Sequence, residues 1–176
     1  MGENTRHYIS YGCPGVELVT SPWAAAFYLN LPSLSVPNAS DNDITIIVEP
    51  SSGILRAVWA RQMLTGSLID SYSYLLDEAV KAGCRFWHLD LRLRIWPAAT
   101  FRTWIIETFA PLATQRLGGP VHVAYWVADN QQAKANDLLA GDMQVQLAKV
   151  GFYMAFFEKE LDARAWLCQQ QDAAAS

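Results

Sequence analysis

The spacing of hydrophobic residues changes along the chain, and each change marks a predicted element. From position 44 onward, "ITIIVEP" and "ILRAVWA" are β-branched and apolar runs separated by "SSG". That pattern predicts two antiparallel strands joined by a glycine-containing turn. The next segment, "TGSLIDSYSYLLDEAVKAGC", repeats its apolar residues at helical spacing. Ser67 and Asp70 fit a capping box at the start of this helix, and Gly83 fits a left-handed residue at its end.

The second half of the chain alternates buried-strand patterns with amphipathic ones. "CRFWHLDL" and "PVHVAYWV" are almost continuously apolar, as in parallel strands that are covered on both faces. Between them, "PAATFRTWIIETFAPLATQRLGG" predicts a helix that starts at Pro97 and is kinked or ended by Pro111. A helix over "NQQAKANDLLAGDM", a segment "MQVQLAKV" that we assign as a helix although it also alternates like a strand, a strand "GFYMAFFE" and a closing helix "EKELDARAWLCQQQ" follow.

This order of elements predicts an α/β domain over residues 43–170. Two strands are followed by helices and strands in alternation, and right-handed crossovers make that a mixed, mainly parallel sheet of about five strands with helices packed on it. Residues 1–42 differ, because they mix proline, glycine and serine with aromatic and aliphatic residues and have no helical stripe. We expect an extended N-terminal arm with short strands that packs on the domain or on a second subunit.

Composition and charge exclude several classes of protein. The chain has 176 residues, of which 52% are hydrophobic and 17% charged, so we expect one compact domain and not a disordered chain. The net charge is −4 without any basic run, which argues against a nucleic-acid partner. The apolar runs are short and the amino terminus has no signal-peptide core, so we expect a cytoplasmic protein without stable membrane insertion.

Four segments together carry a resemblance to a known family. They are the helix "LIDSYSYLLDEAVKAG", the strand "FWHLDLR" with Asp90, the strand "VHVAYWV" followed by Asp129, and the terminal "LDARAWL". Over residues 43–168 this order resembles the STAS, or SpoIIAA-like, domains of anti-sigma-factor antagonists and the lipid-transfer proteins grouped with them. In phosphoregulated members a Ser or Thr directly follows the acidic residue. Here the first hydroxyl after Asp90 is that of Thr100, so the usual phosphoswitch is not expected.

The junction after the third strand is the main candidate for a binding site. Asp90, Arg92 and Arg94, with Thr100 in the following helix, lie at the carboxyl end of a predicted parallel strand, where α/β folds place ligands. Two arginines beside a helix N-terminus suit an anion. The alternative is structural: Asp90 ends the strand, and the arginines are solvated or pair with carboxylates.

Aromatic residues and histidines are the remaining candidates. Trp87, Trp104 and Trp126 fit a core, whereas three other tryptophans are candidates for an interface or a pocket rim. These three are Trp23, Trp59 and Trp96. His88 and His122 lie in consecutive predicted strands, but no third ligand stands at a suitable spacing and no two cysteines form a C-x-x-C pair. We therefore expect no metal and no cofactor.

Two functions remain open from the sequence. The first is a non-enzymatic STAS-like module that regulates or binds a protein partner or itself, with a homodimer as the expected form. The second is a domain of the same fold that binds a small apolar or lipid-like ligand and reads its acidic head group with Arg92 and Arg94. No nucleophile elbow, dinucleotide loop or P-loop occurs in the sequence, so no catalytic residue is assigned.

Overall fold

The computed structural model describes residues 44–60, 65–93, 99–129, 131 and 142–175. The predicted arm, residues 1–42, lies outside the described residues. So do three candidate residues of the sequence analysis and nearly all of the helix expected over "NQQAKANDLLAGDM". The three candidates are Trp23, Arg94 and Trp96.

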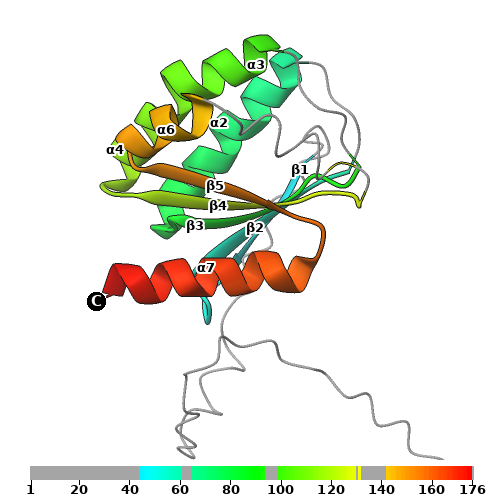
Figure 1. The fold of residues 1–176 in the computed structure, drawn as a ribbon, viewed down its shortest axis with the longest axis vertical. Coiled ribbons are helices and arrows are strands. Elements are labelled where there is room, and N and C mark those ends of the chain that lie inside the picture. The colour runs from blue at the N-terminus through cyan, green and yellow to red at the C-terminus, as the bar shows by residue number, and fades with distance from the viewer. Residues whose placement is uncertain (1–43, 61–64, 94–98, 130, 132–141, 176) are drawn as a thin grey trace, which may run out of the picture. The chain divides into compact units, whose positions relative to one another are not determined.

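A single five-stranded sheet organises the described residues (Figure 1), with its strands in the order β1-β2-β3-β4-β5. β1 and β2 form the predicted antiparallel hairpin, and each later pair of neighbours is parallel. The hairpin turn contains Gly53 at φ +63°, a backbone conformation that glycine adopts without steric cost. The mixed, mainly parallel sheet of the prediction is confirmed. The strands are β1 (Ile44–Glu49), β2 (Ile54–Trp59), β3 (Phe86–Asp90), β4 (Val121–Trp126) and β5 (Phe152–Phe157).

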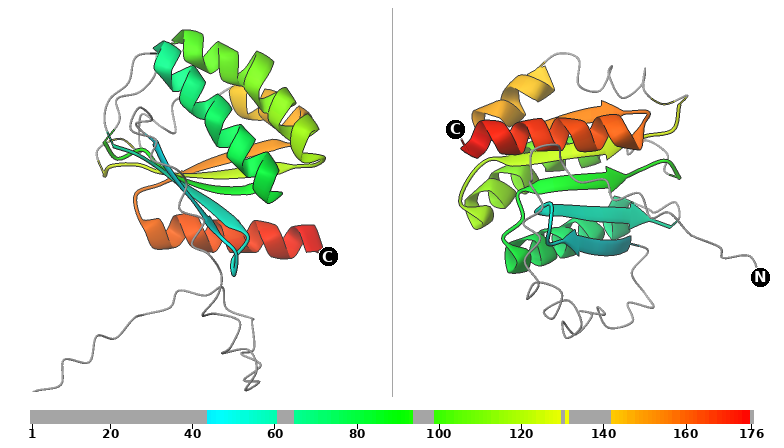
Figure 2. Two further views of the ribbon diagram at one scale, coloured as in Figure 1. Left: turned by 180° about the vertical axis from the view of Figure 1, so that it is seen from behind. Right: turned by 90° about the horizontal axis from the view of Figure 1, so that it is seen from below.

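The helices divide unequally between the two faces of the sheet (Figures 1 and 2). The described crossover helices lie on one face, and the C-terminal helix lies on the other. Every new strand is added on the same side of the previous one, so right-handed crossovers place their helices on a common face. None of the described helices is long and apolar enough to cross a membrane. The helices are α2 (Thr65–Ala82), α3 (Ala99–Trp104), η1 (Ile105–Phe109), α4 (Ala110–Leu117), α6 (Asp142–Lys149) and α7 (Glu160–Ala175).

One local prediction about the ends of α2 is wrong, and one is confirmed. α2 already begins at Thr65, so Ser67 lies inside the helix, where its carbonyl accepts a hydrogen bond from the Ser71 hydroxyl at 2.8 Å. The capping box is therefore absent. At the other end, Gly83 has φ +64°, and the next residue, Cys84, donates its N–H to the carbonyl of Ala79 at 2.9 Å. This is the left-handed helix end that the sequence predicts.

Pro111, which the sequence predicted would kink or end its helix, does not end it. The chain instead passes from α3 through one π-helical turn, η1, into α4, and Pro111 stands in the first turn of α4. In the π turn the Ala110 N–H bonds to the Ile105 carbonyl, five residues back instead of four. Proline has no N–H and its ring crowds the carbonyl four residues back, so a wider turn just before it lets the helix continue.

An aromatic core fills the layer between the sheet and the crossover helices. Tyr72 of α2 is its centre: its ring stacks on Trp59 and meets Phe101 and Phe109 edge to face, each at 5.3 Å between ring centroids. Trp87 and Trp104 belong to the same cluster, as predicted. Trp59, which the sequence suggested for an interface or a pocket rim, is 1% exposed and lies in this core.

The face covered by α7 has a much smaller apolar core. Its fully buried apolar residues are Ile54, Ala124, Ala163 and Leu167. Beside them, the imidazole of His122 stacks between the rings of Phe86 and Tyr153, which forms an aromatic ladder across β3, β4 and β5. Phe157 and Trp166 are partly buried and pack against this small core, and the same face includes the predicted Asp90 junction.

Candidate functional site

Asp90 is the last residue of β3, and its side chain, on the α7 side of the sheet, is only 5% exposed. Arg92, two residues later, occupies both of its oxygens. The Arg92 Nε donates to Oδ1 at 3.0 Å, a terminal guanidinium nitrogen donates to Oδ2 at 2.8 Å, and the Arg92 backbone N–H donates to Oδ1 at 3.1 Å. The bidentate geometry is the strongest that an arginine and a carboxylate form, and it raises the pKa of Arg92.

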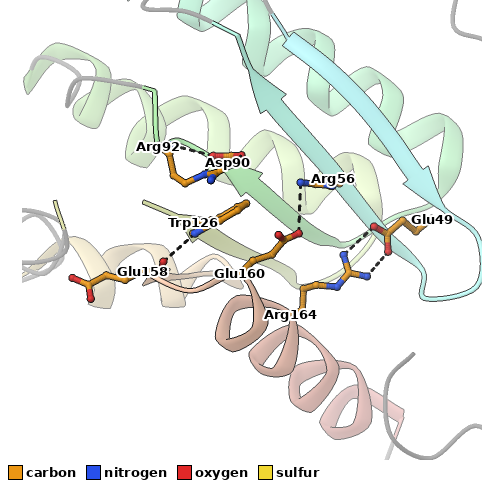
Figure 3. Close-up of polar contacts among 8 residues, drawn as sticks. All are labelled: Glu49, Arg56, Asp90, Arg92, Trp126, Glu158, Glu160 and Arg164. Carbon is orange, nitrogen blue, oxygen red and sulfur yellow. Dashed lines mark hydrogen bonds and ion pairs between the residues drawn. The ribbon is translucent and has the colours of Figure 1, made fainter. Parts of the chain in front are cut away.

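The guanidinium of Arg92 also lies flat on an aromatic ring. Its central carbon is 3.4 Å from the centre of the Trp126 ring, a close cation–π contact. The Trp126 indole N–H donates in turn to the Glu158 carbonyl at 3.0 Å. Asp90, Arg92 and Trp126 therefore form one connected unit, which we call the strand-end clamp, and it joins the ends of β3, β4 and β5 (Figure 3).

The clamp bears directly on the predicted anion site. The structure brings Asp90 and Arg92 together, but it engages the charge of Arg92 with an internal carboxylate and its flat face with an indole. Thr100 is exposed on α3, and no hydrogen bond or ion pair among the described residues joins it to the clamp. Of the two readings of this junction, the described contacts match the structural one, in which the arginine pairs with a carboxylate.

The strand order also bears on the expectation of a ligand at the carboxyl ends of the strands. Ligands of open α/β sheets bind where the strand order reverses and two neighbouring crossovers leave the sheet on opposite faces. In the described part of the sheet the order runs from β1 to β5 without a reversal. The carboxyl ends of these strands are therefore not separated by a crevice of that kind.

A second polar group ties α7 to the β1–β2 hairpin, and the sequence analysis did not find it. Arg164 of α7 donates two hydrogen bonds to the Glu49 carboxylate, at 2.9 and 2.6 Å, which lowers the pKa of Glu49 (Figure 3). Glu160, one turn earlier, lies 3.5 Å from Arg56 of β2. Gln171 donates to the Ser52 carbonyl at 2.7 Å. The only sequence signal was the recurrence of polar residues along one side of α7.

His88 lies beneath this group and is fully buried. Neither of its ring nitrogens has a hydrogen-bond partner among the described residues. Burial, and then the positive charges of Arg56 and Arg164, lower its pKa to about 4, so the imidazole is neutral at pH 7. Burying a neutral imidazole without hydrogen-bond partners costs folding free energy, so His88 destabilises the α7 face.

The two histidines do not form a pair. In the β3–β4 register His122 stands opposite Phe86, and His88 stands opposite Ala124, so the imidazoles are offset by two residues along the strands. Burial, and then the charge of Arg85, lower the pKa of His122. Within the part of the chain that the structure describes, no group of three or more His, Cys, Asp and Glu side chains is placed to hold a metal ion.

Comparisons with known proteins add no relative. No family model, no curated protein and no solved structure matches this chain.

Proposed function

We propose that this chain is a non-enzymatic interaction module, built on a STAS-like α/β domain, that acts by binding protein surfaces. One contrast carries the proposal. At the end of β3, the charges of Asp90 and Arg92 are paired with each other, whereas large apolar side chains are exposed on the elements along both edges of the sheet. These exposed side chains are Ile47 and Val48 of β1, Val145 of α6, Val150, and Tyr153 of β5, and Leu93, Leu112 and Leu161 are exposed elsewhere on the described residues. Exposed apolar groups clustered along sheet edges are typical of interaction surfaces.

The packing between the sheet and the crossover helices supports a binding module over a carrier. A carrier of this architecture would hold its apolar ligand in that layer, lined by aromatic residues. Here the aromatic rings of the layer contact one another, with centroid distances of 5.2 Å between Trp104 and Phe109 and 6.1 Å between Phe109 and Phe152. The head-group reader that a carrier would need, Arg92, is paired with Asp90.

Native mass spectrometry of the freshly purified chain, under gentle and then denaturing conditions, tests this proposal. We expect no small-molecule mass in the gentle spectrum, whether the chain is monomeric or assembled. A reproducible small-molecule mass that is lost on denaturation would contradict the proposal and would favour the carrier. The variant Arg92→Met serves as a control, because a carrier that reads an anion with Arg92 would lose that mass.

A further inference from the structure

Among the described strands, β5 lies at an edge of the sheet, and its sequence lacks the residues that usually protect an edge. Its sequence, "FYMAFF", contains no charge and no proline. Natural edge strands are usually blunted by lysine, proline, a bulge or an inward-pointing charge, because an unprotected edge pairs with another strand. Among the described strands, β5 has β4 as its only neighbour. The backbone groups on the other side of β5 can therefore form hydrogen bonds with a further strand.

The hydrogen bonds to β4 show which backbone groups face that open side. The carbonyls of Gly151 and Phe157 accept from the N–H groups of Val121 and Val127 in and beside β4, both at 2.9 Å. Backbone groups of alternate residues in a strand point to opposite sides. Phe152 and Met154 therefore direct their N–H and C=O groups away from β4, toward the open edge.

Exposed apolar side chains flank the edge on both faces of the sheet. Tyr153 is 40% exposed on the α7 side, where its ring extends the ladder through His122. On the other side, α6 packs against β5 and exposes Val145, and Val150 is exposed in the turn that leads into β5. A strand added to β5 would cover apolar surface above and below the sheet as well as bond to the backbone.

The charges around β5 differ between its two ends. Lys149 is exposed just before the strand. Beyond the strand, the exposed charges are two carboxylates and one ammonium group, from Glu158, Asp162 and Lys159. A second β5 in antiparallel orientation brings the basic end of each copy to the acidic end of the other. A parallel orientation would place like charges together.

We infer that two copies of this chain associate through their β5 strands, antiparallel and related by a two-fold axis, into one continuous sheet. The inference rests on the proposed interaction function, and it names the surface and the partner. A two-fold interface uses the same patch on both copies, so a strand without charge and with oppositely charged ends is complementary to itself. The exposed tyrosines and valines of both copies would lie along this junction.

Sedimentation equilibrium across a concentration series tests the inference with two matched variants. Tyr153→Lys puts a lysine from each copy onto the same short stretch of edge, and we expect at least about a tenfold weaker dimer. Ile47→Lys makes the same change on the other edge strand, at a residue that is 49% exposed, and we expect no effect. Circular dichroism of both variants shows whether they keep the fold.

If Tyr153→Lys disturbs the fold, two further experiments test the dimer: a charge reversal at both ends of β5, and hydrogen exchange of backbone amides. Lys149→Glu should weaken the dimer severalfold, and adding Glu158→Lys should restore it. Hydrogen exchange at the Phe152 and Met154 amides should slow as the protein concentration rises. A chain that stays monomeric, or a dimer that is sensitive to Ile47→Lys and insensitive to Tyr153→Lys, overturns the inference. Neither result overturns the proposed function. That proposal is contradicted instead by a small molecule that is reproducibly bound to the purified chain.

Discussion

The two faces of the sheet are held together by different kinds of contact. On the crossover side, Trp59, Tyr72, Trp87 and Phe109 interlock around the strands in a large aromatic core. On the α7 side, the apolar core is small, and the helix is attached by Glu49–Arg164, Arg56–Glu160 and a glutamine bond. Apolar burial is non-directional and scales with area, whereas ion pairs depend on geometry, pH and salt. The two faces should therefore respond differently to the same perturbations.

The largest effect should come from truncating the aromatic core. Phe109→Ala removes a ring that contacts Tyr72, Trp87 and Phe152, and we expect the free energy of unfolding to fall by about 4 kcal/mol. Urea unfolding followed by tryptophan fluorescence measures this. Trp166→Ala, which truncates a half-buried ring on the α7 side, is the matched control and should cost clearly less. Equal losses would show that the two faces contribute alike.

Acid should act on the α7 face through His88. Its folded pKa of about 4 is below its unfolded value of about 6.5, so the unfolded state takes up the proton first as the pH falls. The free energy of unfolding should therefore decrease by about 3 kcal/mol between pH 6.5 and pH 4. Urea titrations across this range measure the loss.

His88→Leu separates this effect from the titration of carboxylates. The variant should lose most of the slope between pH 6.5 and pH 4, and what remains belongs to other groups, including Glu49. At pH 7 it should be more stable by about 1 kcal/mol, because an unpaired buried imidazole is removed. A loss of stability at pH 7 would mean that the imidazole has a partner in solution.

The strand-end clamp should respond as a paired unit. Arg92→Met leaves the buried Asp90 carboxylate without its partner, and we expect a loss of about 2 kcal/mol in the free energy of unfolding. Asp90→Asn combined with Arg92→Met should cost less than the sum of the two single changes, because no lone charge remains. Strict additivity in this double-mutant cycle would show that the two side chains do not interact.

The smallest effects should come from the ion pairs that hold α7, and they should differ from each other. Glu49→Gln disrupts a bidentate, half-buried pair with Arg164 and should cost about 1 kcal/mol. Glu160→Gln disrupts a longer, more exposed contact with Arg56 and should cost less than about 0.5 kcal/mol. Urea unfolding at low and high salt measures both. The reverse order would mean that bidentate geometry does not strengthen the first pair.

Local patterns predicted the elements well because those patterns are caused by local rules. The β-branched runs around Gly53, the stripe of α2, the left-handed Gly83 and the buried strands β3 and β4 follow from backbone preferences and side-chain spacing. The sequence left open whether Pro111 kinks or ends its helix. The helix continues because a single widened turn relieves the clash of the proline ring, and that turn is stabilised by the core residues Ile105 and Phe109.

The candidate site shows a different limit. The sequence identified Asp90 and Arg92, which are two residues apart in the chain, and one of its two alternatives had the arginines solvated or paired with carboxylates, without naming Asp90 as the partner of Arg92. It did not reveal that the guanidinium lies on Trp126, or that Glu49 and Arg164, 115 positions apart, share two hydrogen bonds. Contacts of that kind depend on which strands are neighbours.

The amino-acid sequence by itself determined the α/β class, the hairpin and the alternation of helices with parallel strands, because hydrophobic period and turn chemistry act over a few residues. Only the tertiary structure decided the strand order, the isolation of α7 on one face, the burial of Trp59 and of His88, and the position of β5 at an edge. These features depend on contacts between residues that are distant in the chain. No local pattern records such contacts, since many arrangements would bury the same apolar stripes.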